Sequence, residues 1–238
     1  MKPFSFAFQH ATPHGVLSAF HLPDTPEPVA EEILSQLDTQ EAEFALSTKG
    51  FRQIQFVGGR LAARHAANQL RMRLPALLPD ERGTPSAPDN LRVSISHKGN
   101  LAIALVSPPG PFHLGVDLET YGPPRPNIIP KVLTAKELEE IEQLSDPQRR
   151  WLSTLIRFSI KECIYKAIDP YVRRYVGFDE ASVHPDLDGT ATVNLHLPGE
   201  DGSFWTNARY FWLRGWLLTS VRIGRNKEIQ VESSDAGG

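Results

Sequence analysis

Residues 149–168 read RRWLSTLIRFSIKECIYKAI, a stretch long enough for one extended helix. Ile156, Ile160 and Ile164 recur every four positions, which places them on one face and predicts that this face packs against a core. We expect the helix to end at Pro170, because proline cannot donate the backbone hydrogen bond that would continue it. The rest of the chain must therefore supply the surface that covers this helix.

Capping residues mark the start of this helix and of two others. Asp146 is a good N-cap, and the proline that follows it suits the first helical position. Asp38 with Glu41, and Thr134 with Glu137, have the spacing of a capping box. Two shorter helices are therefore predicted to begin just after Asp38 and Thr134.

Strand patterns follow each long helix. In the second half, the candidates are residues 190–197, 208–213, 216–223 and 228–232. In the first half, a helix over 51–73 is followed by a hairpin of 91–97 with 101–107. A third strand is predicted over 113–119, where the second half begins. The alternating aromatic residues of 4–8 indicate one more strand.

This order of elements predicts an α+β protein with two similar halves, each a long helix packed on a small, mainly antiparallel sheet. We place the halves at residues 1–112 and 113–238 and expect an active site at their interface. The similarity lies in element order alone. A duplicated chain of this kind can build internally the interface that a dimer would supply, so we expect a monomer.

Composition excludes several classes of protein. The chain has 238 residues, of which 40% are hydrophobic and 22% charged, as in ordinary globular proteins. Its net charge of −3 gives no general attraction to nucleic acid or anionic lipid. The single cysteine, Cys163, excludes an internal disulfide, and no apolar run is long enough for a membrane span. A cytoplasmic protein that binds neither membrane nor nucleic acid is expected.

The strand over 113–119 carries an acidic pair. Asp117 and Glu119 are two residues apart, so both carboxylates project from the same face of the strand. Such a pair is either a solvated strand end or a site for a cation, and oxygen ligands of this kind suit Mg²⁺.

A polar row follows one face of the long helix. Phe158, Glu162 and Lys166 are four residues apart and therefore stack. The row is either a surface ion pair or the border of a cleft, where Glu162 adds a third carboxylate and Lys166 holds a phosphate. Cys163 beside it is expected to be a packing residue and not a nucleophile.

Basic and hydroxyl groups in the first half are the remaining candidates. Arg52 and Arg60 lie on the helix over 51–73, next to the pair Gly58-Gly59, which permits close approach of a ligand or backbone. The hairpin strand over 91–97 ends in Ser96 and His97. The arginines are either solvated surface groups or partners of a phosphate, and a lone histidine at a turn is usually just exposed.

Taken together, these motifs resemble the 4′-phosphopantetheinyl transferases, in particular the monomeric class of the surfactin- and enterobactin-synthetase type. The resemblance is carried by Ser94-Ile95-Ser96-His97, by Gly115-Val116-Asp117-Leu118-Glu119, and by the segment FSIKECIYKA at 158–167. Residues 56–64 and 174–178 are similar to the enterobactin-synthetase branch. Phe158 replaces the tryptophan of many members, and Cys163 an alanine or serine.

The resemblance implies transfer of the 4′-phosphopantetheine arm of coenzyme A to a serine of an acyl or peptidyl carrier protein, with release of adenosine 3′,5′-bisphosphate. It implies Asp117, Glu119 and Glu162 as ligands of Mg²⁺ (or Mn²⁺). Lys166 is implied to contact the pyrophosphate, with Lys161 assisting nearby. The residues implied to hold the 3′-phosphate and adenosine are Arg52, Arg60, Arg82, Ser96 and His97. For the base that receives the serine proton, Glu162 is our candidate and Lys166 the alternative.

Two other functions use similar residues: a Mg²⁺-dependent phosphodiesterase or nuclease, and a non-catalytic coenzyme A-binding module. The acidic balance argues against the former, and the complete set of three carboxylates against the latter. A carrier protein that is acidic around its serine would need a basic and apolar docking patch. The candidates are the loop 121–131, with Ile128, Ile129 and Lys131, and the segment 173–175.

Overall fold

The computed structural model describes residues 3–226. The chain divides into two compact units, Met1–Gly110 and Pro111–Gly238, and we describe each by itself. Both units combine helices with an antiparallel sheet, which confirms the predicted α+β class.

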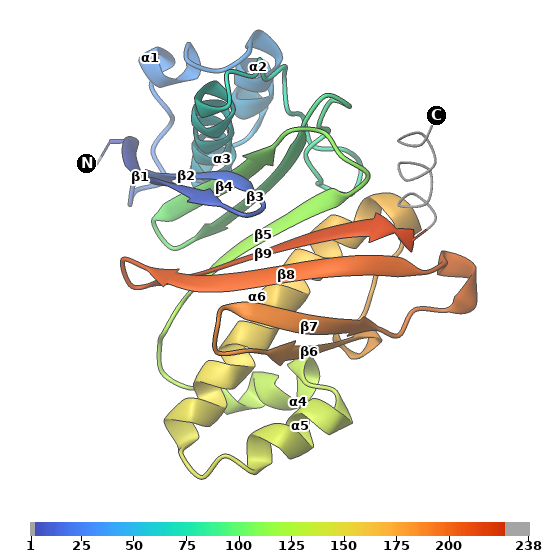
Figure 1. Ribbon diagram of the computed structural model, residues 1–238. Helices are drawn as coiled ribbons and strands as arrows, with labels where there is room; N and C mark the ends of the chain where they lie inside the picture. Colours follow the sequence, from blue (N-terminus) through green and yellow to red (C-terminus); the bar gives the residue numbers. More distant parts are fainter. Residues whose placement is uncertain (1–2, 227–238) are drawn as a thin grey trace, which may run out of the picture. The chain divides into compact units, whose positions relative to one another are not determined.

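In the first unit, helix α3 lies on a four-stranded sheet with the order β1-β2-β4-β3 (Figure 1). Its elements are β1 (Ser5–Thr12), β2 (Gly15–His21), α1 (Glu31–Leu34), α2 (Thr39–Ser47), α3 (Gly50–Gln69), β3 (Arg92–Lys98) and β4 (Leu101–Ser107). The hairpin of β3 and β4 closes at Gly99 and Asn100, as predicted, with Lys98 opposite Leu101.

The glycine pair in α3 brings this helix close to its sheet. A Cβ atom on Gly58 would lie 2.1 Å from the Leu22 side chain, and one on Gly59 would lie 2.7 Å from Ile95. The two glycines therefore permit close helix–sheet packing, so the approach expected beside Arg60 is made by side chains of the unit itself.

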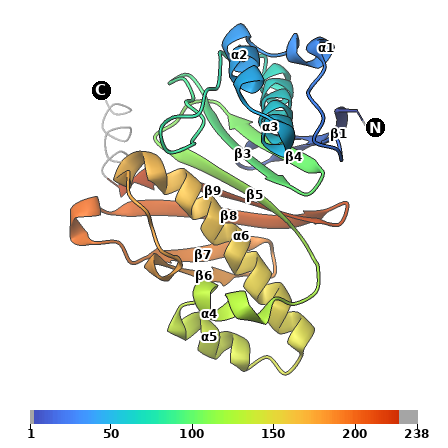
Figure 2. The same ribbon diagram turned by 180° about the vertical axis from the view of Figure 1, so that it is seen from behind.

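In the second unit, the long helix α6 crosses one face of a five-stranded sheet with the order β5-β9-β8-β7-β6 (Figure 2). Its main elements are β5 (His113–Thr120), α4 (Ile129–Val132), α5 (Ala135–Glu142), α6 (Pro147–Val172), β6 (Ala181–Pro185), β7 (Thr190–Leu195), β8 (Phe204–Leu213) and β9 (Trp216–Arg225). Short 3₁₀ turns are η1 (Pro126–Ile128), η2 (Phe178–Glu180) and η3 (Gly199–Asp201). Ile160 and Ile164 are fully buried in the core between α6 and the sheet, as the spacing predicted.

The two units share one connectivity. In each, one strand (β2 or β5) precedes short helices and one long helix, and the unit ends in a hairpin (β3–β4 or β8–β9). That strand pairs with the second strand of the hairpin, β4 or β9, and the second unit has β6 and β7 in addition. The shared strand orders are β2-β4-β3 and β5-β9-β8. The expectation of two similar halves is thus confirmed at the level of topology, beyond element order.

Several predicted boundaries were wrong. Helix α6 continues through Pro170 to Val172 and ends where Arg173 turns left-handed, with φ of 48°. Because Pro170 lies in the last turn, it forfeits one hydrogen bond without breaking the helix. Helix α3 ends at Gln69 and not at 73, because Arg71 also adopts a left-handed conformation. Strands β2 and β6 were not predicted, and the predicted strand 228–232 lies outside the described residues.

Within residues 3–226, no helix combines the length and the apolar character that crossing a membrane requires.

Candidate active site

Strand β5 passes unusually close to helix α6 in the second unit. A Cβ atom on Gly115 would lie 1.9 Å from the carbonyl oxygen of Cys163, so only glycine fits here. Asp117 follows two residues later on the same face and therefore also points toward α6. The Gly-x-Asp-x-Glu pattern thus places an acidic strand against the helix that carries Glu162 and Lys166.

The carboxylate of Asp117 is held on both oxygens. Its Oδ2 accepts a hydrogen bond of 2.8 Å from the hydroxyl of Ser159, and its Oδ1 lies 3.1 Å from the Lys166 amine. Lys166 also donates to the carbonyl oxygen of Val116 at 2.8 Å. The Asp117 side chain is 9% exposed and that of Lys166 is 30% exposed, so this ion pair lies at the edge of the core with the lysine toward solvent.

The two glutamates predicted for this site lie on the same two elements. Glu119 is buried on β5, and Glu162 is half-buried on α6.

Burial, together with the nearby charge of Glu162, raises the pKa of Tyr165. Burial and the charge of Asp117 raise the pKa of Cys163, which is fully buried. Cys163 is therefore a protonated packing residue, as predicted.

The oxygen donors of Asp117, Glu119 and Glu162 have the chemistry that suits Mg²⁺. Within residues 3–226, however, no group of three or more His, Cys, Asp or Glu side chains is arranged to hold a metal ion. Asp117 is paired with the ammonium group of Lys166 instead. The metal site therefore stays a prediction.

Lys161 lies away from this pair, on a buried face of α6. Its ammonium group donates to the carbonyl oxygens of Val132 and Phe178, both at 2.8 Å, and to Glu137 at 2.7 Å. These three bonds use all three N–H groups of a side chain that is 0% exposed. A contact between Lys161 and a pyrophosphate would require this arrangement to open, so the geometry favours a structural role.

A pocket in the first unit collects several of the predicted phosphate-binding residues. It has a volume of about 220 Å³, and its lining includes Arg52 and Arg60 of α3, His97 of β3 and Gly83 of the loop 79–85. This loop is closed by a bridge between Pro79 and Pro85 and by a hydrogen bond from the Arg82 backbone to Asp80. Basic residues that are distant in the sequence thus meet around one hollow.

Arg60 forms part of the pocket wall. Its guanidinium group donates twice to the carbonyl oxygen of Leu77, at 2.9 and 2.8 Å, and lies 3.9 Å from the centre of the Phe56 ring. Burial lowers its pKa to about 10, partly opposed by the charge of Glu41, so Arg60 stays cationic at neutral pH.

Ser96 and Arg82 do not line this pocket. Ser96 precedes His97 on β3, so its side chain lies on the opposite face of the strand and is buried there. Arg82 is exposed beside the lining residue Gly83. Sequence reasoning missed Gln55 and Phe56 in the lining, although both belong to the same helix as Arg52.

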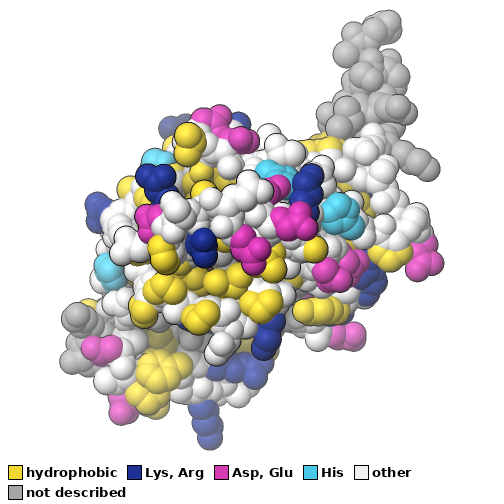
Figure 3. Space-filling view, turned by 90° about the horizontal axis from the view of Figure 1, so that it is seen from below, with side chains coloured by type: hydrophobic (Ala, Val, Ile, Leu, Met, Phe, Trp, Pro, Cys, Tyr) yellow, Lys and Arg dark blue, Asp and Glu magenta, His cyan; other side chains and the backbone are white. Residues whose placement is uncertain are grey.

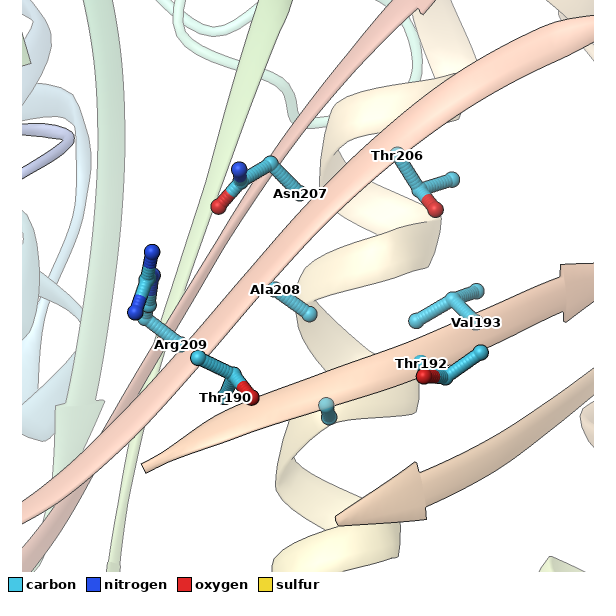
Figure 4. Close-up of a pocket in the computed structure, with 8 residues that line it drawn as sticks. Thr190, Thr192, Val193, Thr206, Asn207, Ala208 and Arg209 are labelled. Atoms are coloured by element: carbon cyan, nitrogen blue, oxygen red, sulfur yellow. The ribbon is translucent and has the colours of Figure 1, made fainter. Parts of the chain in front are cut away.

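A second hollow, of about 350 Å³, lies between β7 and β8 in the second unit (Figure 4). These strands pair only at Thr190 with Arg209 and at Ala191 with Ala208, and then diverge. Its lining includes three threonines, Thr190, Thr192 and Thr206, and none of the predicted site residues.

Ser159 and Thr219 were also missed as parts of the site. Ser159 stands three residues before Glu162 in the quoted helical motif, which is a usable signal. Thr219 lies opposite Asp117 on β9, and no local pattern points to it.

Comparison with known proteins matches both units to one family. Residues 113–219 match the model of the 4′-phosphopantetheinyl transferase superfamily, and residues 40–107 match that of the 4′-phosphopantetheinyl transferase N-terminal domain. The 4′-phosphopantetheinyl transferase Svp of Streptomyces mobaraensis is 33% identical over 219 residues, covering 87% of each chain.

The alignments with other similar proteins cover smaller shares of the two chains. The 4′-phosphopantetheinyl transferase Npt of Nocardia iowensis is 28% identical, covering 71% of this chain and 82% of that one. Enterobactin synthase component D of Salmonella typhi is 32% identical, covering 61% and 59%. The crystal structure of the holo-acyl-carrier-protein synthase of Thermotoga maritima aligns with a TM-score of 0.39 and 17% identity, covering 48% of this chain and 63% of that one.

Proposed function

This chain belongs to the 4′-phosphopantetheinyl transferase family, and from that premise we propose that it converts apo carrier proteins to their holo form. The donor is coenzyme A, the acceptor is a serine of an acyl or peptidyl carrier protein, and the second product is adenosine 3′,5′-bisphosphate. The observation that carries the proposal is the Asp117–Lys166 pair, held between β5 and α6 inside the matched segment 113–219.

The reaction is a displacement at phosphorus. The carrier serine oxygen attacks the β-phosphorus of coenzyme A, and a new serine O–P bond forms. The bond from that phosphorus to the bridging oxygen breaks, and adenosine 3′,5′-bisphosphate leaves with the electron pair. The serine proton passes to a base. In phosphoryl transfer, catalysis depends mainly on positioning the reacting groups and on neutralising the charge of the phosphate oxygens.

We assign Lys166 to the phosphate oxygens and Glu162 to the serine proton. Lys166 already donates hydrogen bonds to two oxygen acceptors, so its amine is oriented as a donor. Glu162 lies one helical turn before it and is half-buried, which leaves its carboxylate accessible from one side. Asp117 fixes the direction of the Lys166 amine.

The proposal includes Mg²⁺, or Mn²⁺ in its place, held by Asp117, Glu119 and Glu162. Bound there, the ion would neutralise pyrophosphate charge. The hard oxygen donors of all three residues support this choice of metal.

For the adenosine 3′-phosphate we propose the pocket of the first unit. Arg52, Arg60 and His97 line it, and planar guanidinium groups match phosphate oxygens. Because Arg60 is already bonded to Leu77, we expect it to add charge to the wall while Arg52 makes the direct contact.

Two observations bear on our proposal for the carrier-docking surface. Arg174 cannot easily contribute, because its guanidinium group is bound to Glu180 and Asp201. Tyr121, in the alternative loop, is 46% exposed, and its ring lies 6.4 Å from that of Trp212, which is 41% exposed. We therefore favour the loop 121–131, with Trp212 beside it, as the docking surface.

The net charge of −3 gives no support to the nuclease alternative. In Figure 3 acidic and basic side chains are interspersed with hydrophobic ones, and no single sign of charge covers this face. We keep the expectation of a monomeric, cytoplasmic enzyme as part of the proposal.

The proposal is tested by incubating the enzyme with coenzyme A, Mg²⁺ and apo carrier proteins of several types. Each modified carrier should gain about 340 Da, the mass of the transferred arm in this phosphoryl-transfer chemistry. An unchanged mass for acyl and peptidyl carriers alike would refute the proposal. Labelled single-stranded and duplex DNA, which should stay intact, test the nuclease alternative.

A further inference from the structure

The two oxygens of the Asp117 carboxylate have partners on opposite sides. Oδ1 contacts Lys166, and Oδ2 contacts the Ser159 hydroxyl at 2.8 Å. A carboxylate with one fixed oxygen can still rotate about its side-chain torsions. With both oxygens fixed, only one orientation remains.

Ser159 begins a row of three buried side chains that carry hydroxyl or thiol groups. The Ser159 hydroxyl oxygen is 2.7 Å from that of Thr219, and the Thr219 hydroxyl is 3.1 Å from the Cys163 sulfur. All three side chains are 0% exposed. This row is therefore closed to solvent, and the hydrogen bond from Ser159 to Asp117 connects it to the site.

The direction of these bonds follows from the chemistry of the groups. An ionised carboxylate can only accept, so Ser159 must donate its single hydroxyl hydrogen to Asp117. Thr219 must then donate to Ser159, which leaves the Thr219 oxygen as an acceptor for the Cys163 thiol. The Cys163 sulfur also lies 3.4 Å from the backbone carbonyl oxygen of Thr219. The hydroxyl hydrogens of Ser159 and Thr219 therefore both point toward Asp117.

We propose that Ser159 and Thr219 are positioning residues that hold Asp117 in the one orientation from which it aligns Lys166 and offers an oxygen to a divalent cation. This inference rests on the proposed function. Such supporting hydrogen bonds around metal-binding and catalytic carboxylates typically change affinity or activity about 10- to 100-fold when removed.

Matched variants separate positioning from packing. Ser159→Ala removes the hydroxyl with little change of volume. Thr219→Val removes the second hydroxyl but keeps the branched shape, whereas Thr219→Ser keeps the hydroxyl and loses a methyl group. Cys163→Ala removes only the end of the row. Thermal unfolding of each variant reports on folding.

We expect Ser159→Ala to lower kcat about 10- to 100-fold with little change in KM for coenzyme A, and to weaken Mn²⁺ binding, measured by electron paramagnetic resonance without substrate, by a similar factor. Thr219→Val should lower kcat and the affinity for Mn²⁺ about fivefold each, and Thr219→Ser should restore these two quantities. Cys163→Ala should change neither more than about twofold.

Wild-type kcat and Mn²⁺ affinity in a folded Ser159→Ala protein would overturn the positioning role. So would equal losses in Thr219→Val and Thr219→Ser, because packing would then explain them. If the wild-type protein modified no carrier while Ser159→Ala still weakened Mn²⁺ binding, the proposed function would fail and the positioning role would stand.

Discussion

Glu41 and Glu137 make the same set of contacts in the two units. Each is the third residue of a short helix, closes the capping box of that helix and is 0% exposed. Each also pairs with a basic residue of the long helix, Arg64 at 2.6 Å and Lys161 at 2.7 Å. With its other oxygen, each accepts a backbone N–H further along the chain, from Leu77 or Val183.

This correspondence shows that the likeness of the two units extends from topology to a buried carboxylate. A single glutamate in each unit links a short helix, the long helix and a third segment. It also explains why Lys161 is unavailable to a substrate, since its charge neutralises Glu137 in a closed environment.

Replacing Glu137 by Gln should destabilise the protein strongly. The change leaves the buried charge of Lys161 uncompensated, and breaking a buried pair typically costs about 3–5 kcal/mol. Glu41→Gln should cost less, because the Arg64 side chain is 21% exposed while that of Lys161 is 0% exposed. Urea unfolding measures both. The double variant Glu137→Gln/Lys161→Met should recover part of the loss, and an additive or larger loss would contradict the pairing.

Lys166→Ala should impair the chemical step while the fold persists. Removal of one well-placed donor to a developing phosphate charge typically lowers kcat by about 10²- to 10³-fold. The exposed residue Lys136 on α5 provides the control, and Lys136→Ala should transfer at the wild-type rate. Carrier mass measured over time gives kcat for both. A Lys166→Ala enzyme within threefold of wild type would exclude a role in transfer.

Local patterns predicted best those features that depend on a few neighbouring residues. The capping boxes at Asp38 and Thr134 and the hairpin at Gly99 formed as expected, because their bonds lie within four residues. The family resemblance implied that Asp117 and Lys166 belong to one site, and their side chains form an ion pair between β5 and α6.

The failures involve partners that are distant in sequence. Nothing near Lys161 indicates that Glu137, 24 residues away, takes its charge. Nothing near Ser159 indicates Thr219, 60 residues away. Ser96 and His97 are adjacent in sequence, but strand alternation sends their side chains to opposite faces. Contacts between side chains that are distant in the sequence are determined by the complete fold, so local sequence patterns do not predict them.

The ion network of Arg174 should make the loop after α6 sensitive to acid. Arg174 binds Glu180 at 2.5 Å, and this bond lowers the pKa of Glu180 below its ordinary value of 4.5. The stabilisation from Glu180 is therefore complete above that value and is lost as pH falls through the lower, folded-state pKa.

The difference in unfolding midpoint between wild type and Glu180→Gln should accordingly be largest at neutral pH and vanish in strong acid. Urea unfolding at pH 7, 5 and 3 measures it. Glu200 is a nearby exposed carboxylate, and Glu200→Gln should show no such trend. A constant difference between Glu180→Gln and wild type at all three pH values would contradict the assignment.

Removal of divalent cations should stop transfer. With EDTA present, the carrier should keep its apo mass, and excess Mg²⁺ should restore the reaction. Asp117→Asn removes one charged oxygen ligand, so it should need a higher Mg²⁺ concentration for half-maximal rate. The exposed residue Glu139 gives the control variant Glu139→Gln. Full activity in EDTA would show that the three carboxylates serve another purpose.

The pocket of Arg52, Arg60 and His97 should recognise the 3′-phosphate of coenzyme A in particular. Arg52→Ala should raise KM for coenzyme A about tenfold or more, the usual effect of losing a hydrogen bond to a charged group. With 3′-dephospho-coenzyme A as donor, the same variant and the wild type should have equal KM values, because the contacted group is absent. Arg73, which is exposed beyond the end of α3, supplies the control Arg73→Ala. If Arg52→Ala weakened both donors equally, the pocket would bind a different part of the molecule.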